Sequence, residues 1–513
     1  MYHNRLVQIA NASHVPLYGP TARRESWVKN NRNYYYDTHL NSVGAADDAW
    51  FCNVFRRADP TIITAPVMKY DVVSQQNVRL FGPTMRNLLQ KLKQNGLLYI
   101  LILGVILRLL AVLVLQPNLS GGDTNFYLTY GPQLVRNVAP RMSPAPVYLL
   151  YVGIIEILIP TDFLTTVRLI GLFNIVWHAI IICSTYAIGL RYFKASVAQL
   201  AALIIAINPI FIIECVQPTT ENIYLGLLFA ALAIYSYYQP SPTMRSMGLL
   251  GLLFGLATLT RAVSLLFPAI LAIHLIGSHK WRKGFAAAGV FIAAYGLMVS
   301  TWTVYNYVKW DRIVIGAEGL VGFTWMGIQG QQSPQAVSQA AGNPKNGEQF
   351  NQTLASQVWD VLTHNLPGYV VGRIKNLLSA YLQPHNTVFF PGASLKDQFA
   401  QWIISSRIVN DLIAITYASE FWPKLMLYIF HFWALVGGIV GMILYRQQFW
   451  RLLPLYGYVL YTTTVHSVLL ALPRYLFPIQ PILIVFASLT TIMVAQFFTA
   501  YARRRTLQSA HES

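Results

Sequence analysis

The stretch GLLYILILGVILRLLAVLVL, residues 96–115, decides the fold class of this chain. Arg108 is its one charged residue, and a helix of this length is about 30 Å long, which matches the hydrocarbon core of a bilayer. The polar sequence SGGDTNFY, residues 120–127, follows closely. We therefore expect Asp123 at the membrane–water boundary, where a carboxylate stays ionised and still reaches a lipid head group.

The composition of the whole chain agrees with a membrane protein. Of 513 residues, 55% are hydrophobic and 11% are charged, and the mean hydropathy is +0.44, which excludes an ordinary soluble enzyme. The net charge of +18 would fit nucleic-acid binding, but the basic residues gather at the ends of apolar runs and no nucleic-acid-binding signature accompanies them. We therefore expect membrane lipids, and no nucleic acid, as partners. The three cysteines are scattered and show neither a disulfide framework nor metal-ligand spacing.

Apolar runs separated by short polar breaks predict an all-α polytopic membrane protein with about 9–11 transmembrane helices and two large extracytoplasmic loops. The expected parts are a polar N-terminal extension, 1–95; an N-terminal transmembrane module, 96–308, with a first extracytoplasmic loop at 117–143; a large extracytoplasmic loop region, 309–420; C-terminal transmembrane helices, 421–500; and a basic cytoplasmic tail, 501–513. The extension is cytoplasmic unless the true start lies near Met85, and both alternatives stay open.

Basic residues set the expected orientation. The positive-inside rule places Arg503–Arg505 and the Lys280–Lys283 group in the cytoplasm and both large loops outside. This requires the apolar run 246–277, which contains Arg261, to be one crossing or a re-entrant pair. The group Arg191–Lys194 then lies outside, against the rule, so the topology of the middle of the chain stays open.

Charged residues inside apolar segments are costly in a bilayer and are therefore functional candidates. They are Arg108, Glu156, Arg168, Glu214, Glu221 and Arg261. The alternative for each is a structural ion pair or a side chain that reaches the interface. For Asp123 the alternative is an N-cap that begins a short helix after the two preceding glycines.

The segment VHSVLLALPRY, residues 465–475, holds a second candidate site. Arg474 is expected at the start of an extracytoplasmic helix, on the same face as Asp123, and its planar guanidinium is suited to binding a phosphate. The helix N-terminus adds a favourable potential for an anion. His466, in the preceding helix, is a candidate second donor to that phosphate. The alternatives are an interfacial anchor for Arg474 and a histidine satisfied within the helix bundle for His466.

Taken in order, several stretches of the chain resemble the GT-C membrane glycosyltransferases, in the branch of aminoarabinose transferases, protein O-mannosyltransferases and rhizobial galacturonosyltransferase-like proteins. They are the Gly-Asp-x-x-x-Tyr passage 122–127, Pro146–Leu150 with Val167–Leu169, Asn208–Pro209 with Thr220–Asn222, Gly255–Arg261, Trp302–Asn306 with Asp311–Ile315, and Pro473–Pro478. The resemblance extends over about residues 96–485 and leaves out the N-terminal extension.

The resemblance implies a GT-C fold and a hexosyl- or pentosyltransferase of a bacterial inner membrane. It implies transfer of a sugar, with inversion, from a polyprenyl phosphate donor to an extracytoplasmic glycolipid, polysaccharide or protein. The family's first-loop acid falls on Asp123, the expected catalytic residue. The family's late Pro-Arg-Tyr falls on Arg474, which we expect to bind the donor phosphate together with His466. The expected supporting residues are Tyr127, Arg108, Glu221 and Arg261.

Two positions depart from the family pattern. Thr124 stands where many relatives have a second acidic residue, and Tyr305 takes the place of the arginine in Trp-x-x-Arg-Asn, so the sugar and the acceptor are not predicted. No cofactor is expected, because the donor arrives activated, and one aspartate does not make a metal site; a divalent cation stays an open alternative. The other functions left open are a lipid or solute transporter, an O-antigen ligase or polymerase-like enzyme, and a degenerate family member retained as a scaffold.

Overall fold

The computed structural model describes residues 83–512 apart from 118–121, 141–143, 330–346 and 406–408. Every regular element in this part is a helix, which confirms the predicted all-α class. The expectations for residues 1–82 lie outside the described residues.

The α-helices, in chain order, are α4 (Pro83–Val114), α5 (Gly122–Val135), α6 (Pro146–Leu158), α7 (Phe163–Tyr192), α8 (Ala195–Ile207), α9 (Pro209–Val216), α10 (Thr220–Tyr238), α11 (Met244–Thr260), α12 (Phe267–Ser278), α13 (Trp281–Trp310), α14 (Leu320–Gln329), α16 (Gly347–His364), α17 (Leu366–Tyr381), α18 (Leu395–Ser405), α19 (Val409–Thr416), α20 (Phe421–Leu444), α21 (Leu453–Val468), α22 (Pro473–Leu476) and α23 (Gln480–Glu512). Short 3-10 helices are η3 (Ala262–Ser264), η4 (Thr387–Phe389), η5 (Arg446–Gln448) and η6 (Phe477–Ile479).

Five helical stretches of the described part are long and apolar enough to cross a bilayer, which confirms the multi-pass character. They are Gly96–Val114, Phe163–Tyr192, Trp281–Trp310, Phe421–Leu444 and Pro473–Ala502. A sixth span results if α8 and α9, which are bent by 49° at their junction, are counted as one. This is fewer than the 9–11 predicted, because several predicted crossings are short or broken helices, among them α6, α11 and α12.

The break between α8 and α9 follows directly from the sequence. Pro209 has no N–H, and the side chain of Asn208 caps α9, so the last carbonyls of α8 lose their helical partners. Arg108 of α4 donates hydrogen bonds of 2.9 Å to the carbonyls of Ile205 and Ala206. The buried guanidinium therefore satisfies the backbone groups that the break leaves free.

The predicted apolar run 246–277 is two helices with a break at Arg261. The α11 helix ends at Thr260, Arg261 is extended with φ −146° and ψ 113°, and η3 and α12 follow. An extended residue directs its side chain away from the helix axis that precedes it. The break thereby allows Arg261 to reach the start of α10.

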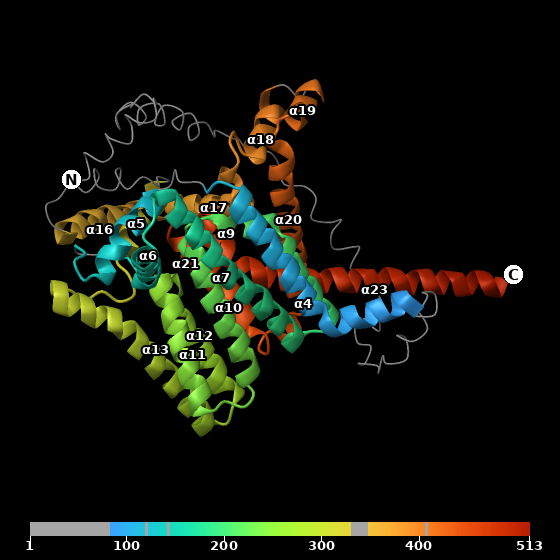
Figure 1. Ribbon diagram of the computed structural model, residues 1–513, viewed down its shortest axis with the longest axis horizontal. Helices are drawn as coiled ribbons and strands as arrows, with labels where there is room; N and C mark the ends of the chain where they lie inside the picture. The colour runs from blue at the N-terminus through green and yellow to red at the C-terminus, as the bar shows by residue number, and fades with distance from the viewer. Residues whose placement is uncertain (1–82, 118–121, 141–143, 330–346, 406–408, 513) are drawn as a thin grey trace. The chain divides into compact units, whose positions relative to one another are not determined.

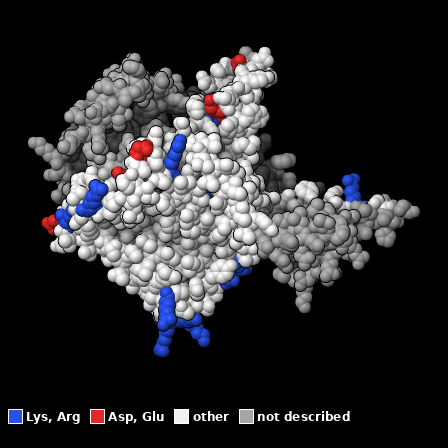
Figure 2. All heavy atoms as spheres, viewed as in Figure 1, with Lys and Arg blue, Asp and Glu red and all other residues white. Residues whose placement is uncertain are grey.

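The buried core is built around α10, most of whose residues are shielded from solvent. This helix packs against α7 and α11, while α20 packs along α23 (Figure 1). Figure 2 shows that the visible face is largely free of charged side chains between a basic group at its lower end and acidic side chains towards its upper part. An uncharged band between polar ends is the pattern expected for helices in a bilayer.

The region 309–420 contains α14, α16, α17, α18 and α19, and none of these helices is a candidate span. This agrees with the predicted non-spanning character of the region. Its position outside the cytoplasm stays a prediction.

Helices α5 and α6 approach each other unusually closely. A Cβ atom on Gly153 would overlap the backbone carbonyl of Gly131, and one on Gly131 would lie 2.7 Å from the carbonyl oxygen of Leu149. The two glycines therefore let the backbones touch. Since α5 begins with Asp123 and Tyr127, this contact sets where both side chains lie.

We expect Gly153→Ala to destabilise the protein by about 1–3 kcal/mol, although alanine normally favours a helix by about 1 kcal/mol over glycine. The reason is the overlap with the backbone of Gly131. Thermal unfolding in detergent measures the effect. Gly296→Ala in α13 is the matched control, because its Cβ would meet no atom within 4 Å. An equal or higher midpoint for Gly153→Ala would contradict the close packing.

Candidate functional site

Four charged side chains from distant parts of the chain meet in one cluster. Arg474 of α22 donates from Nη1 to Oδ2 of Asp123 and from Nε to Oε1 of Glu221, both at 3.0 Å. Arg261 forms a second ion pair with Oε1 of Glu221. We call Asp123, Glu221, Arg261 and Arg474 the charge cluster. The formal charges of its two carboxylates and two guanidinium groups cancel.

Each member of the charge cluster lies at the end of a helix. Asp123 and Glu221 are in the first turns of α5 and α10, where a negative side chain interacts favourably with the helix dipole. Arg474 follows Pro473, which begins α22, and Arg261 lies at the break after α11. Four helix ends therefore converge, and the charges do not have to emerge from the middle of apolar helices.

Exposure divides the charge cluster into a closed half and an open half. The side chains of Glu221 and Arg261 are 1% and 12% exposed, whereas those of Arg474 and Asp123 are 35% and 59% exposed. A ligand from outside can therefore contact Arg474 and Asp123 directly. The buried pair holds Arg474 in place, since Glu221 accepts a hydrogen bond from Arg474 and forms an ion pair with Arg261.

Aromatic rings surround the charge cluster. The guanidinium carbons of Arg261 and Arg474 lie 5.4 and 5.6 Å from the ring centre of Tyr475, within cation–π distance. On the other side, the ring of Tyr127 meets that of Tyr148 edge to face at 4.7 Å. Burial and the neighbouring Asp123 carboxylate raise the pKa of Tyr127, so its hydroxyl stays neutral.

His466 lies next to the charge cluster but does not touch Arg474. Its ring stacks on Tyr475 with 5.3 Å between centres, and Nδ1 donates to the carbonyl of Leu470 at 3.1 Å. The other nitrogen, Nε2, is buried and has no hydrogen-bond partner among the described residues. The ring of Tyr475 thus lies between contacts to His466 and contacts to the two arginines.

Of the predicted supporting residues, Tyr127, Glu221 and Arg261 belong to this site, and Arg108 does not. Arg108 is fully buried, and its hydrogen bonds to described residues go to carbonyls of α4 and α8. Its position explains the broken helix and gives it no contact with Asp123. The other predicted intramembrane acid, Glu156, has one buried oxygen without a partner in the described part of the chain.

The structure also brings in a residue that sequence reasoning missed. His385, from the region 309–420, donates from Nε2 to the buried carboxylate of Glu214 at 2.6 Å. Asn386, with the positive φ of 67°, donates to the same carboxylate at 3.1 Å. The only sequence signal was the His-Asn pair after a proline, in a segment that matched no motif. Among the described residues, no group of three or more His, Cys, Asp or Glu side chains could hold a metal ion.

Comparison with known proteins finds a family match for a part of the chain that contributes to this site. Residues 163–305 match the family model described as dolichyl-phosphate-mannose-protein mannosyltransferase. The match confirms the predicted resemblance to GT-C membrane glycosyltransferases over these residues. It includes Glu221 and Arg261 and leaves Asp123, His385 and Arg474 outside. Comparison with curated proteins found no match.

Several solved structures are similar to this chain at low sequence identity. The apo oligosaccharyltransferase from Archaeoglobus fulgidus is 13% identical with a TM-score of 0.48, and the match covers 81% of this chain and 52% of that one. The archaeal oligosaccharyltransferase AglB from the same organism, in complex with an inhibitory peptide and a dolichol-phosphate, is 14% identical with a TM-score of 0.48, over 82% and 52%. ArnT from Cupriavidus metallidurans in the apo state is 12% identical with a TM-score of 0.33, over 77% of each chain. This chain matches only about half the length of the oligosaccharyltransferase.

We expect the buried Glu221–Arg261 pair to show strong coupling in a double-mutant cycle. Glu221→Gln leaves the buried Arg261 without its carboxylate partner and should lower the free energy of unfolding by about 3–5 kcal/mol. Arg261→Gln should lower it less, because Glu221 keeps its ion pair with Arg474. The double variant should lose less than the sum of the two. Unfolding in mixed detergent micelles measures all three.

The matched control is Arg312→Gln, which breaks the more exposed pair of Arg312 with Glu318. Surface pairs contribute about 0–1 kcal/mol, so its effect should be small. Additive losses at Glu221 and Arg261 would show that the two residues do not act as a pair.

Proposed function

We propose that this chain is a GT-C-type membrane glycosyltransferase that transfers a hexose or pentose from a polyprenyl phosphate donor, with inversion, to an extracytoplasmic acceptor. The observation that carries the proposal is the open half of the charge cluster, where an accessible carboxylate and an accessible guanidinium lie 3.0 Å apart. The family match supports the donor class, because dolichyl phosphate is a polyprenyl phosphate.

The proposed reaction needs a proton acceptor and a site for the leaving group. Asp123 accepts the proton of an acceptor hydroxyl as its oxygen attacks the anomeric carbon of the sugar. The bond from that carbon to the phosphate oxygen breaks, and the phosphate leaves with increased negative charge. Arg474 stabilises that charge through its guanidinium. A single displacement of this kind inverts the anomeric carbon.

Arg474 is prepared for this role by the buried half of the charge cluster. Glu221 binds Nε and leaves the far side of the guanidinium, with Nη1, directed to the open half. The Tyr475 ring contacts both arginines and limits their movement. A fixed cation stabilises a developing anion without reorganisation during the reaction. Since the donor arrives activated, the proposed step uses no cofactor.

The remaining features of the proposal concern location. We infer a bacterial inner membrane, with the charge cluster on the extracytoplasmic face. The support is the distribution of basic residues along the sequence, such as the Lys280–Lys283 group between α12 and α13. The acceptor is a glycolipid, a polysaccharide or a protein.

We expect Asp123→Asn to lower the rate of sugar transfer by about 10²–10⁴-fold, because asparagine cannot accept the proton. The assay uses membranes or purified protein with a radiolabelled pool of polyprenyl phosphate sugars. Asp162→Asn is the matched control, since Asp162 caps the start of α7 and asparagine caps a helix equally well. Transfer that survives Asp123→Asn would assign the base to another residue. Wild-type protein that transfers no sugar from any donor would overturn the proposed function.

We expect both Arg474→Ala and Arg474→Lys to lower transfer by about 10²–10³-fold. Lysine keeps the charge, but its single ammonium group cannot reproduce the two guanidinium nitrogens that contact Glu221 and Asp123. The exposed Arg451→Lys is the control, because its side chain bonds to Gln448. Full activity of Arg474→Lys would mean that only the charge matters.

A further inference from the structure

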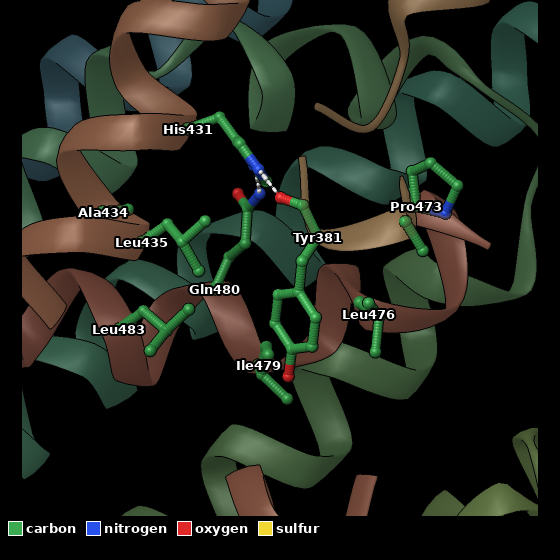
Figure 3. A pocket seen from close by; sticks show the side chains of 10 residues that line it. Tyr381, His431, Ala434, Leu435, Pro473, Leu476, Ile479, Gln480 and Leu483 are labelled. Atoms are coloured by element: carbon green, nitrogen blue, oxygen red, sulfur yellow. Dashed lines mark hydrogen bonds between the residues drawn. The ribbon is translucent and has the colours of Figure 1, made fainter. Parts of the chain in front are cut away.

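The segment 382–394, which joins α17 to α18, is held against the transmembrane helices on several sides. Before it, His431 of α20 donates to the carbonyl of Tyr381 at 2.6 Å and accepts from Gln480, beside a pocket between these helices (Figure 3). At its far end, the buried Lys424 donates to three successive carbonyls, those of residues 391–393. These anchors fix the backbone on either side of His385.

One hydrogen bond of His385 and two of the neighbouring Asn386 fix the histidine. Its Nε2 donates to Oε2 of Glu214 at 2.6 Å, and Asn386 donates to the same oxygen and to the carbonyl of Ile210. Glu214 is fully buried at the end of α9, and Thr219 donates to its other oxygen. A buried carboxylate with this many partners is a rigid acceptor. It therefore determines the orientation of the imidazole ring.

The ring of His385 packs against the segment that follows Arg474. It lies 4.8 Å from the ring of Phe477, one turn after Arg474, and it interacts electrostatically with Glu221. Tyr148 interacts electrostatically with both Glu214 and Glu221. Its hydroxyl is fully buried and has no hydrogen-bond partner among the described residues. His385 thus lies within electrostatic range of Glu221, the buried carboxylate of the charge cluster.

We propose that His385 is a further residue that binds the phosphate of the lipid-linked donor, and that Glu214 is its positioning residue; this inference rests on the proposed function. The Nε2–H group is engaged by Glu214, and Nδ1 makes no hydrogen bond to a described residue. In the imidazolium form, Nδ1–H is a charge-assisted donor to a phosphate oxygen.

The test measures binding of farnesyl phosphate, a short polyprenyl monophosphate, to the full-length protein in detergent, with farnesol as the ligand that lacks the phosphate. We expect His385→Gln to weaken binding of farnesyl phosphate by about 10–100-fold at pH 6 and to leave binding of farnesol unchanged. A change confined to folding would affect both ligands alike.

Glu214→Gln and the double variant complete the experiment. Glu214→Gln should also weaken binding of farnesyl phosphate. The double variant should bind farnesyl phosphate no more weakly than His385→Gln alone, since the carboxylate acts through the histidine. If Glu214→Gln does not fold, His385→Gln still decides the question, because glutamine keeps an N–H for Glu214. The control is His364→Gln, from a mostly exposed His–Asp pair in α16.

The outcomes separate this inference from the proposed function. If the wild type transfers sugar and His385→Gln binds farnesyl phosphate as tightly as the wild type, only the role of His385 is overturned. If the wild type transfers no sugar and binds farnesyl phosphate no more tightly than farnesol, the proposed function fails and the inference fails with it.

Discussion

The burial of the Glu221 carboxylate is the constraint on which the rest of the site depends. A carboxylate that is 1% exposed cannot stay charged without partners, and here two guanidinium groups supply them. To reach it, Arg261 has to leave its helix and Arg474 has to begin one. The break after α11 and the start of α22 are therefore requirements of the same ion network. The position of Asp123 follows, because Arg474 extends to it.

The sequence predicted the helical class and placed Asp123 and Arg474 on the same face. Asp123 and Arg474 are 351 positions apart, and both were expected on one face because each follows or begins an apolar run. The structure joins them directly. Glu221 and Arg261 were candidates because a charge in an apolar segment needs a partner. That rule identified the members of the charge cluster, but it could not tell which charges pair.

The rule that a charge in an apolar segment marks a functional residue failed where the interaction partner is distant in the sequence. Arg108 has the same appearance in the sequence as Arg261, yet it bonds to carbonyls, because a proline 101 positions later leaves those carbonyls free. His385 lies in a polar segment where a histidine is unremarkable, and only the fold sets it against Glu214. The described residues contain fewer candidate spans than the 9–11 predicted, for a related reason. Hydropathy detects apolar runs. A helix break at a single residue such as Asn208 also requires that neighbouring helices supply hydrogen-bond partners for the backbone groups that the break leaves free.

The bond between Arg108 and α8 has a consequence for biosynthesis. Because the chain is made from its N-terminus, α4 enters the membrane before α8 exists. During that interval the guanidinium lies in an otherwise apolar helix, at a cost of about 2.5–3.5 kcal/mol on translocon scales. The strongly apolar stretch Gly96–Val114 of α4 makes insertion favourable all the same. The helix is then stable in lipid but incomplete, and the arrival of α8 relieves the charge. The hydrogen bonds of Arg108 thus favour packing of α4 against α8 once α8 has been synthesised.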